Sequence, residues 1–149
     1  MTKNLHKKYK DINIHINASM FCSAASIAPK YDWRSYLNGI FITTAKQGGV
    51  NIIATDAHRL IYLWDKKGFS SCEEIILPIT ELTELVKLSR SPKNRNEIIK
   101  IESCKNKLIA SLKNNNYEFD PIDGIYPSIK DLVKGFPKSS LSDASTLYN

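Results

Sequence analysis

The sequence predicts an α+β fold made of two β-α-β-β-β halves, with two helices packed on a continuous antiparallel sheet. Two observations carry this prediction. Apolar residues recur with the period of a strand, then of a helix, then of several strands, and this order occurs twice along 149 residues. The composition, with 42% hydrophobic and 24% charged residues, is that of a globular chain with enough apolar side chains for one core.

The first half opens with a strand at 12–16, where isoleucines alternate with polar residues. Asn17 is suited to cap the helix that follows, because its side chain can accept a hydrogen bond from the first turn. An apolar stripe then continues to Ala28, and Pro29 ends the helix.

Three strands complete the first half. A β-branched and aromatic stretch at 39–44 is followed by a turn at 46–49, whose two glycines can adopt positive φ. The segment 50–54 returns to form a hairpin, and 60–64 is the next strand.

The second half repeats this order, beginning with a strand at 74–77. Pro78 is suited to the first turn of a helix, where its missing N–H needs no partner. Apolar residues at helical spacing follow, and Ser91-Pro92 ends the helix. The remaining strands are expected at 98–101, 108–112 and 117–119, with turns at 105–107 and 114–116.

Charge divides the chain into a basic arm at 1–11, a single domain at 12–135 and a serine-rich tail at 136–149. Four of the 21 basic residues lie in the first ten positions, and the rest of the chain holds 17 basic and 15 acidic residues. The domain is therefore nearly neutral. The arm is suited either to bind phosphates or to keep the chain soluble, and the tail reads as a loose end or a strand cut short.

Several classes of protein are disfavoured by composition. Cys22, Cys72 and Cys104 are odd in number and widely spaced, which favours free thiols in a reducing compartment and disfavours a zinc site. The longest apolar runs, roughly six residues, are too short to span a bilayer, and no apolar stretch follows the basic start as in a secretory signal. We expect a cytoplasmic protein with no cofactor and no membrane partner.

Two segments carry candidate chemistry. Asp56, His58 and Arg59 are close enough in sequence for acid–base catalysis, but no nucleophile or metal-ligand set accompanies them, which favours a structural polar corner. The segment 30–36 interleaves charges with aromatic residues. That pattern suits phosphate contact and base stacking, or equally a loop whose aromatic side chains pack on the domain.

Three motifs now identify a family. Arg-Ser-Tyr-Leu-Asn-Gly-Ile at 34–40, Ala-Thr-Asp-Ala-His-Arg-Leu at 54–60 and Ile-Asp-Gly-Ile-Tyr-Pro at 122–127 occur in order, with Ile-Ile-Leu-Pro at 75–78 between the last two. Together they resemble landmarks of the middle domain of the bacterial DNA polymerase III β sliding clamp. The resemblance covers about residues 12–134 and implies the DNA-clamp fold and a non-catalytic role.

The resemblance also implies two sets of functional residues. In clamps the helices face duplex DNA and attract its phosphates without reading bases. Another surface binds short peptides from polymerases and clamp loaders in an apolar groove with a polar rim. The DNA-facing residues carried over are Lys30, Arg34, Tyr36, Lys87 and Arg90. The peptide-pocket residues carried over are Thr55, His58, Arg59, Leu60, Pro127 and Leu132.

Departures from the family pattern leave the function open at this point. A clamp subunit has three such domains, so a ring made from this domain would need six copies joined head to tail. Ala57 replaces a glycine, and Thr80 and Asp131 stand where positive charge is common. One hypothesis is a self-associating replication or repair factor that tethers partners to duplex DNA. The alternative is a monomeric regulatory or decoy module that binds clamp partners without encircling DNA, and an enzyme is a third.

Overall fold

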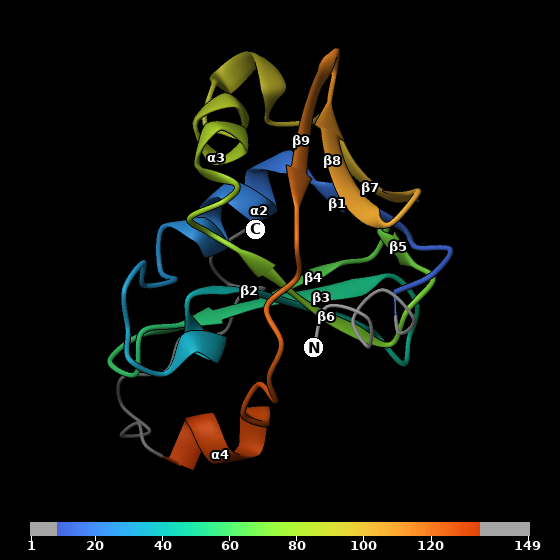
Figure 1. Cartoon of the computed structure of the whole chain (residues 1–149). Helices are drawn as coiled ribbons and strands as arrows, with labels where there is room; N and C mark the ends of the chain where they lie inside the picture. The colour runs from blue at the N-terminus through green and yellow to red at the C-terminus, as the bar shows by residue number, and fades with distance from the viewer. Residues whose placement is uncertain (1–8, 135–149) are drawn as a thin grey trace.

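The protein is described by a computed structural model that covers residues 9–134, so most of the predicted arm and all of the predicted tail lie outside the described residues. Nine strands form two antiparallel sheets in this part of the chain (Figure 1). The predicted α+β class is confirmed. The expectation of one continuous sheet is wrong, because the strands divide between two sheets whose inner faces share one core.

The first half contains β1 (Asn13–Asn17), α2 (Ala18–Ala25), β2 (Gly39–Thr44), β3 (Val50–Thr55) and β4 (Leu60–Asp65), close to the predicted ranges. Asn17 caps α2 as expected, since its Oδ1 accepts a hydrogen bond from the Met20 N–H at 2.9 Å. The helix ends at Ala25, earlier than Pro29 would require. Over the last turn the Ser26 hydroxyl donates to the Ser23 carbonyl at 2.6 Å.

The second half contains β6 (Glu74–Pro78), α3 (Thr83–Ser89), β7 (Ile98–Cys104), β8 (Lys107–Leu112) and β9 (Asn115–Phe119). The prediction that Pro78 begins the helix is wrong. Pro78 is the last residue of β6 and lies opposite Gly39 of β2. Because β6 is an edge strand of its sheet, the missing N–H of proline breaks no ladder bond there.

Each sheet contains the opening strand of the other half. The four-stranded sheet has the order β4-β3-β2-β6, and the five-stranded sheet has the order β5-β1-β7-β8-β9. The short strand β5 (Phe69–Ser70) was not predicted and pairs with β1. Thus the opening strand of each half hydrogen-bonds to strands of the opposite half, and this arrangement gives the two halves pseudo-twofold symmetry.

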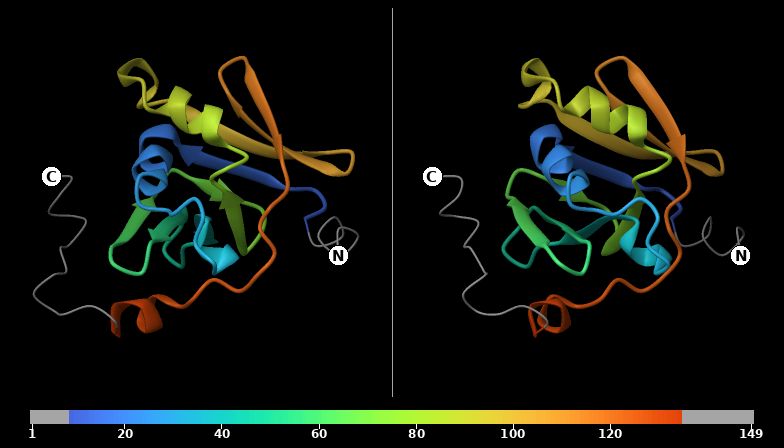
Figure 2. Two further views of the ribbon diagram at one scale, coloured as in Figure 1. Left: turned by 60° about the vertical axis from the view of Figure 1, so that its left-hand side comes forward. Right: turned by 90° about the vertical axis from the view of Figure 1, so that its left-hand side faces the viewer.

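The two helices lie side by side against the core between the sheets (Figures 1 and 2). Phe21 and Ala24 of α2 and Leu85 and Val86 of α3 are buried there. Alternation along β2 separates two faces of the four-stranded sheet: Ile40 and Ile42 enter the main core, and Phe41 points to the opposite face.

That opposite face is covered by the chain after β9. An extended segment crosses to it and ends in α4 (Ile129–Lys134), which sequence patterns did not predict (Figure 1). Ser128 begins this helix, since its hydroxyl accepts a hydrogen bond from the Asp131 N–H at 3.2 Å. A second apolar cluster forms below the sheet from buried Leu37, Ile53, Ile76 and Tyr126. Among residues 9–134, no helix has the length and apolar character needed to cross a bilayer.

Candidate functional site

The turn between β3 and β4 is built around two side chains. Thr55 is fully buried, and its hydroxyl donates to the Arg59 carbonyl at 2.6 Å while accepting from the Ala57 N–H at 3.1 Å. The Asp56 carboxylate accepts from the N–H groups of His58 and Arg59, at 2.9 and 2.7 Å, and pairs with the Arg59 guanidinium at 3.0 Å. The segment is therefore a rigid polar corner.

The electrostatics of Asp56 agree with that role. Partial burial raises the pKa of its carboxyl, but hydrogen bonds from the His58 and Arg59 backbone, together with the Arg59 side chain, outweigh burial and hold the pKa below its ordinary value. A carboxylate that accepts hydrogen bonds from three donors in this way stabilises the turn and is a poor proton acceptor. The geometry thus favours the structural interpretation of Asp56, His58 and Arg59 over the catalytic one.

An apolar surface lies beside this corner. Leu60 and Leu132 both pack against the second apolar cluster, although they are 72 positions apart in sequence. Pro127 lines an adjoining hollow of about 270 Å³ together with Phe41, Tyr62 and Tyr126. The Phe41 and Tyr126 rings stack at 4.6 Å, and burial raises the pKa of the Tyr126 hydroxyl.

The predicted pocket residues are of two kinds, apolar and polar. Leu60, Pro127 and Leu132 supply apolar surface, and Thr55 fixes the backbone beneath it. His58 and Arg59 are exposed at the end of the same turn.

The predicted DNA-facing residues lie on α3 and on the loop after α2, which occupy the same side of the molecule (Figure 2, right). Lys87 is exposed on α3, and Arg90 is exposed directly after its last residue. The Lys87 ammonium lies 3.4 Å from the Glu84 carboxylate, an exposed pair that competes only weakly with a phosphate. Lys30 is exposed on the loop.

Two of these five residues are more constrained than the sequence suggested. Arg34 forms a forked pair with Asp32, at 2.9 and 3.1 Å, and this contact raises the pKa of the guanidinium and lowers that of the carboxyl. Tyr36 packs against the second apolar cluster, so part of its ring is used for packing.

Comparison with known protein families identifies the family of this domain. The family model of the DNA polymerase III beta subunit, central domain, matches residues 15–128. The chain belongs to this sliding-clamp family. The matched range begins in β1 and ends just before α4, so it includes both helices, both sheets and the Thr55–Leu60 corner.

Solved structures of clamps share the fold. The beta subunit from Pseudomonas aeruginosa is similar over 85% of this chain and 35% of its own, with 20% identity and a TM-score of 0.58. The beta subunit from Borrelia burgdorferi, solved with a natural product, covers 80% of this chain and 32% of its own, with 20% identity and a TM-score of 0.63. The clamp from Bartonella birtlesii bound to griselimycin covers 80% and 34%, with 23% identity and a TM-score of 0.61.

The clamp-family chain spans about a third of the length of these solved proteins. A comparison with curated proteins finds no match. The similarity to the solved clamps therefore establishes the fold, whereas the partners and assembly of a whole clamp are matters for proposal.

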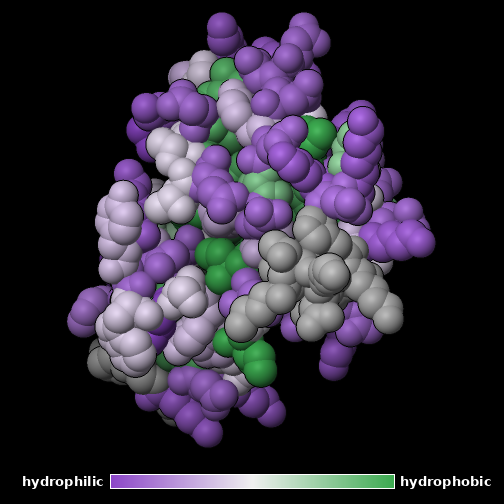
Figure 3. Space-filling model, viewed as in Figure 1, coloured by the Kyte–Doolittle hydropathy of each residue, from purple (hydrophilic) through white to green (hydrophobic). Residues whose placement is uncertain are grey.

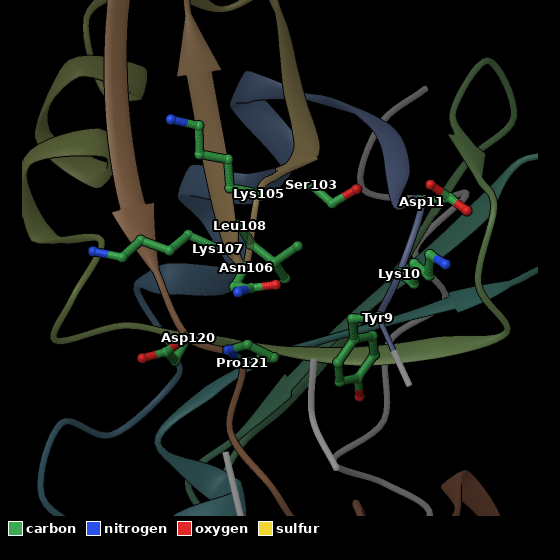
Figure 4. A pocket seen from close by; sticks show the side chains of 10 residues that line it. All are labelled: Tyr9, Lys10, Asp11, Ser103, Lys105, Asn106, Lys107, Leu108, Asp120 and Pro121. Carbon is green, nitrogen blue, oxygen red and sulfur yellow. The ribbon is translucent and has the colours of Figure 1, made fainter. Parts of the chain in front are cut away.

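Sequence reasoning missed a hollow near the start of the clamp domain. It has a volume of about 270 Å³ and lies between Tyr9 and the β7–β8 turn (Figure 4). Lys10, Lys105 and Lys107 contribute positive charge to its lining, but Asp11 and Asp120 line it too, and Lys107 pairs with Glu118 at 3.0 Å. These charges largely balance, and no sequence motif joins segments so far apart. Hydrophilic residues dominate the upper part of the face seen in Figure 3.

The strained position in the corner gives a stability prediction. Ala57 has a φ of +78°, in the left-handed region where a Cβ is unfavourable. Ala57→Gly is expected to raise the free energy of unfolding by about 0.5–1 kcal/mol, since relief of strain exceeds the added entropy of the unfolded chain. Denaturant unfolding measures the change.

The control is Ala45→Gly, a turn position without positive φ, which is expected to destabilise the protein. Equal destabilisation by both substitutions would show that Ala57 is not strained.

Proposed function

We propose that this protein is a non-catalytic replication factor of the sliding-clamp type that holds partner proteins on duplex DNA. The family match supports the general role. One observation carries the finer proposal: α2 and α3 lie side by side on one surface, with exposed basic residues on α3 and on the adjoining loop. Sequence-independent attraction to phosphates at such a surface allows movement along DNA.

The same proposal assigns the peptide groove. The apolar wall of Leu60, Pro127 and Leu132 would bury a hydrophobic anchor of a short peptide, and His58 and Arg59 would contact its polar groups. The occupants we propose are segments of replicative polymerases and clamp loaders. Such partners place the protein in the cytoplasm.

Encirclement of DNA requires self-association, because one such domain covers only part of a ring. At one edge of each sheet lie β4 and β9, which pair with no further strand within the described residues and can pair with another chain. Head-to-tail contact between copies closes a ring only if the rotation between neighbours permits it.

Light scattering tests the assembly. We expect a closed oligomer, for which six copies is the number implied by a three-domain, two-subunit clamp, and we expect duplex DNA to stabilise it. A circular duplex should retain the protein longer than a linear duplex of equal length, since a ring slides off free ends. A monomer at every concentration, with and without DNA, would contradict the ring and leave the monomeric module as the interpretation.

A further inference from the structure

Two large aromatic side chains have no role in the duplex surface or the peptide groove. Tyr31 and Trp33, on the loop between α2 and β2, are 88% and 87% exposed. Tyr62 and Trp64 on β4, by comparison, are only 38% and 42% exposed. Apolar rings held so fully in water gain nothing from packing, and exposed aromatic residues of this kind mark binding sites.

The loop backbone that carries these rings is fixed by Asp32, which lies between them. The Asp32 N–H donates to the Asn38 side chain at 2.8 Å, and the Asn38 amide donates back to the Asp32 carbonyl at 2.9 Å. The Asp32 carboxylate accepts from the Arg34 N–H at 2.8 Å and from the Arg34 guanidinium. Because the loop is already ordered, little backbone entropy is lost when a ligand binds.

Cations accompany the rings. The Arg34 guanidinium lies 5.3 Å from the centroid of the Trp33 ring, in cation–π contact, and Lys30 is exposed just before Tyr31. The neighbouring helix α2 has no acidic side chain. Exposed rings interleaved with cations are suited to a ligand that has flat π faces and regular negative charge.

We propose that Tyr31 and Trp33 form a stacking site for unpaired bases of single-stranded DNA. The interior bases of a duplex are stacked on each other and are not available to these rings, so the ligand is a single strand or the unpaired end of a duplex. Lys30, exposed just before Tyr31, would contact a phosphate, and Arg34 would keep the Trp33 ring in place through its pair with Asp32. The site lies within one chain and adds to the proposed duplex tether without depending on ring closure.

The two tryptophans allow a direct test by fluorescence. Trp64→Phe leaves Trp33 as the sole tryptophan, and Trp33→Phe leaves Trp64 on β4. Titration with short oligo(dT) at low salt is expected to quench the emission of the Trp64→Phe protein and to leave that of the Trp33→Phe protein nearly unchanged. Equal quenching of both proteins, or quenching of neither, would overturn the proposal.

Affinity measurements separate stacking from charge. Tyr31→Ala and Trp33→Ala are each expected to weaken oligo(dT) binding about tenfold and to leave duplex binding nearly unchanged. Phe69→Ala, which removes a 49% exposed ring on β5, is the matched control and should not affect oligo(dT) binding. If these variants lost duplex and oligo(dT) affinity in parallel, the loop would contact phosphates only. If the protein bound an apolar peptide but not oligo(dT), the loop would belong to a protein partner. Either result would overturn the stacking site. If the unmodified protein bound oligo(dT) but did not bind duplex DNA, the proposed duplex-tethering function would be contradicted and the stacking site would stand.

Discussion

Leu60→Asp is expected to abolish capture of a clamp-binding peptide, with a loss of at least about a hundredfold in affinity. Leu60 packs against the apolar cluster of Leu37, Ile53, Ile76 and Tyr126 and forms one wall of the proposed groove. An aspartate there removes apolar contact and places an unpaired carboxylate where the peptide's hydrophobic anchor must lie. Isothermal calorimetry with a peptide from a replicative polymerase measures the loss.

Controls distinguish a lost contact from a lost fold. Leu60→Met retains the apolar volume and is expected to bind within a few-fold of the unmodified protein. Thr44→Asp adds the same charge at an exposed position on β2 of the same sheet and is expected to have no effect. Arg59→Glu, at the exposed rim, should weaken binding by about tenfold. A folded Leu60→Asp protein with unchanged affinity would remove the groove from this surface.

The double substitution Lys87→Glu and Arg90→Glu is expected to weaken binding to duplex DNA by about a hundredfold at low salt. Both side chains are exposed, Lys87 on α3 and Arg90 at its C-terminal end, and the weak pairing of Lys87 with Glu84 leaves its ammonium available to a phosphate. Loss of two phosphate contacts should also reduce the slope of log affinity against log salt by about two. Fluorescence anisotropy over a salt series measures both quantities.

The matched control changes the same net charge elsewhere. Lys100→Glu with Lys113→Glu alters exposed positions outside α2 and α3, on β7 and in the β8–β9 turn. Ile99 and Ile101, on either side of Lys100, face the core, so Lys100 faces outward. We expect a small effect from this pair. Equal losses from the two double variants would mean that DNA responds to overall charge and not to the helix surface.

Local patterns predicted most of the individual elements. Alternating isoleucines located β1, the Asn17 cap located the start of α2, and Gly48 and Gly49 have the positive φ that the hairpin turn requires. These features depend on neighbours a few residues away, and the sequence displays such neighbours directly. The motif at 54–60 located the corner for the same reason, since Thr55 and Asp56 bond within it.

Features that depend on distant pairing were not predictable in this way. A proline such as Pro78 is suited both to the start of a helix and to the end of an edge strand. Only the pairing of Pro78 with Gly39 distinguishes the two positions. The division into two sheets depends on which half β1 and β6 join. Likewise, the ring of Tyr36 is partly committed to a cluster completed by residues near the other end of the domain, including Leu132.

The exchange of strands between halves has a consequence for folding. β1 is hydrogen-bonded to β7, more than 80 positions later, and β6 is hydrogen-bonded to β2. Neither half is therefore an autonomous folding unit, since each would lack a strand of its own sheet and expose the edge that the strand covers. The domain should gain stability in one cooperative step, at a rate limited by closure of the long loop between β1 and β7.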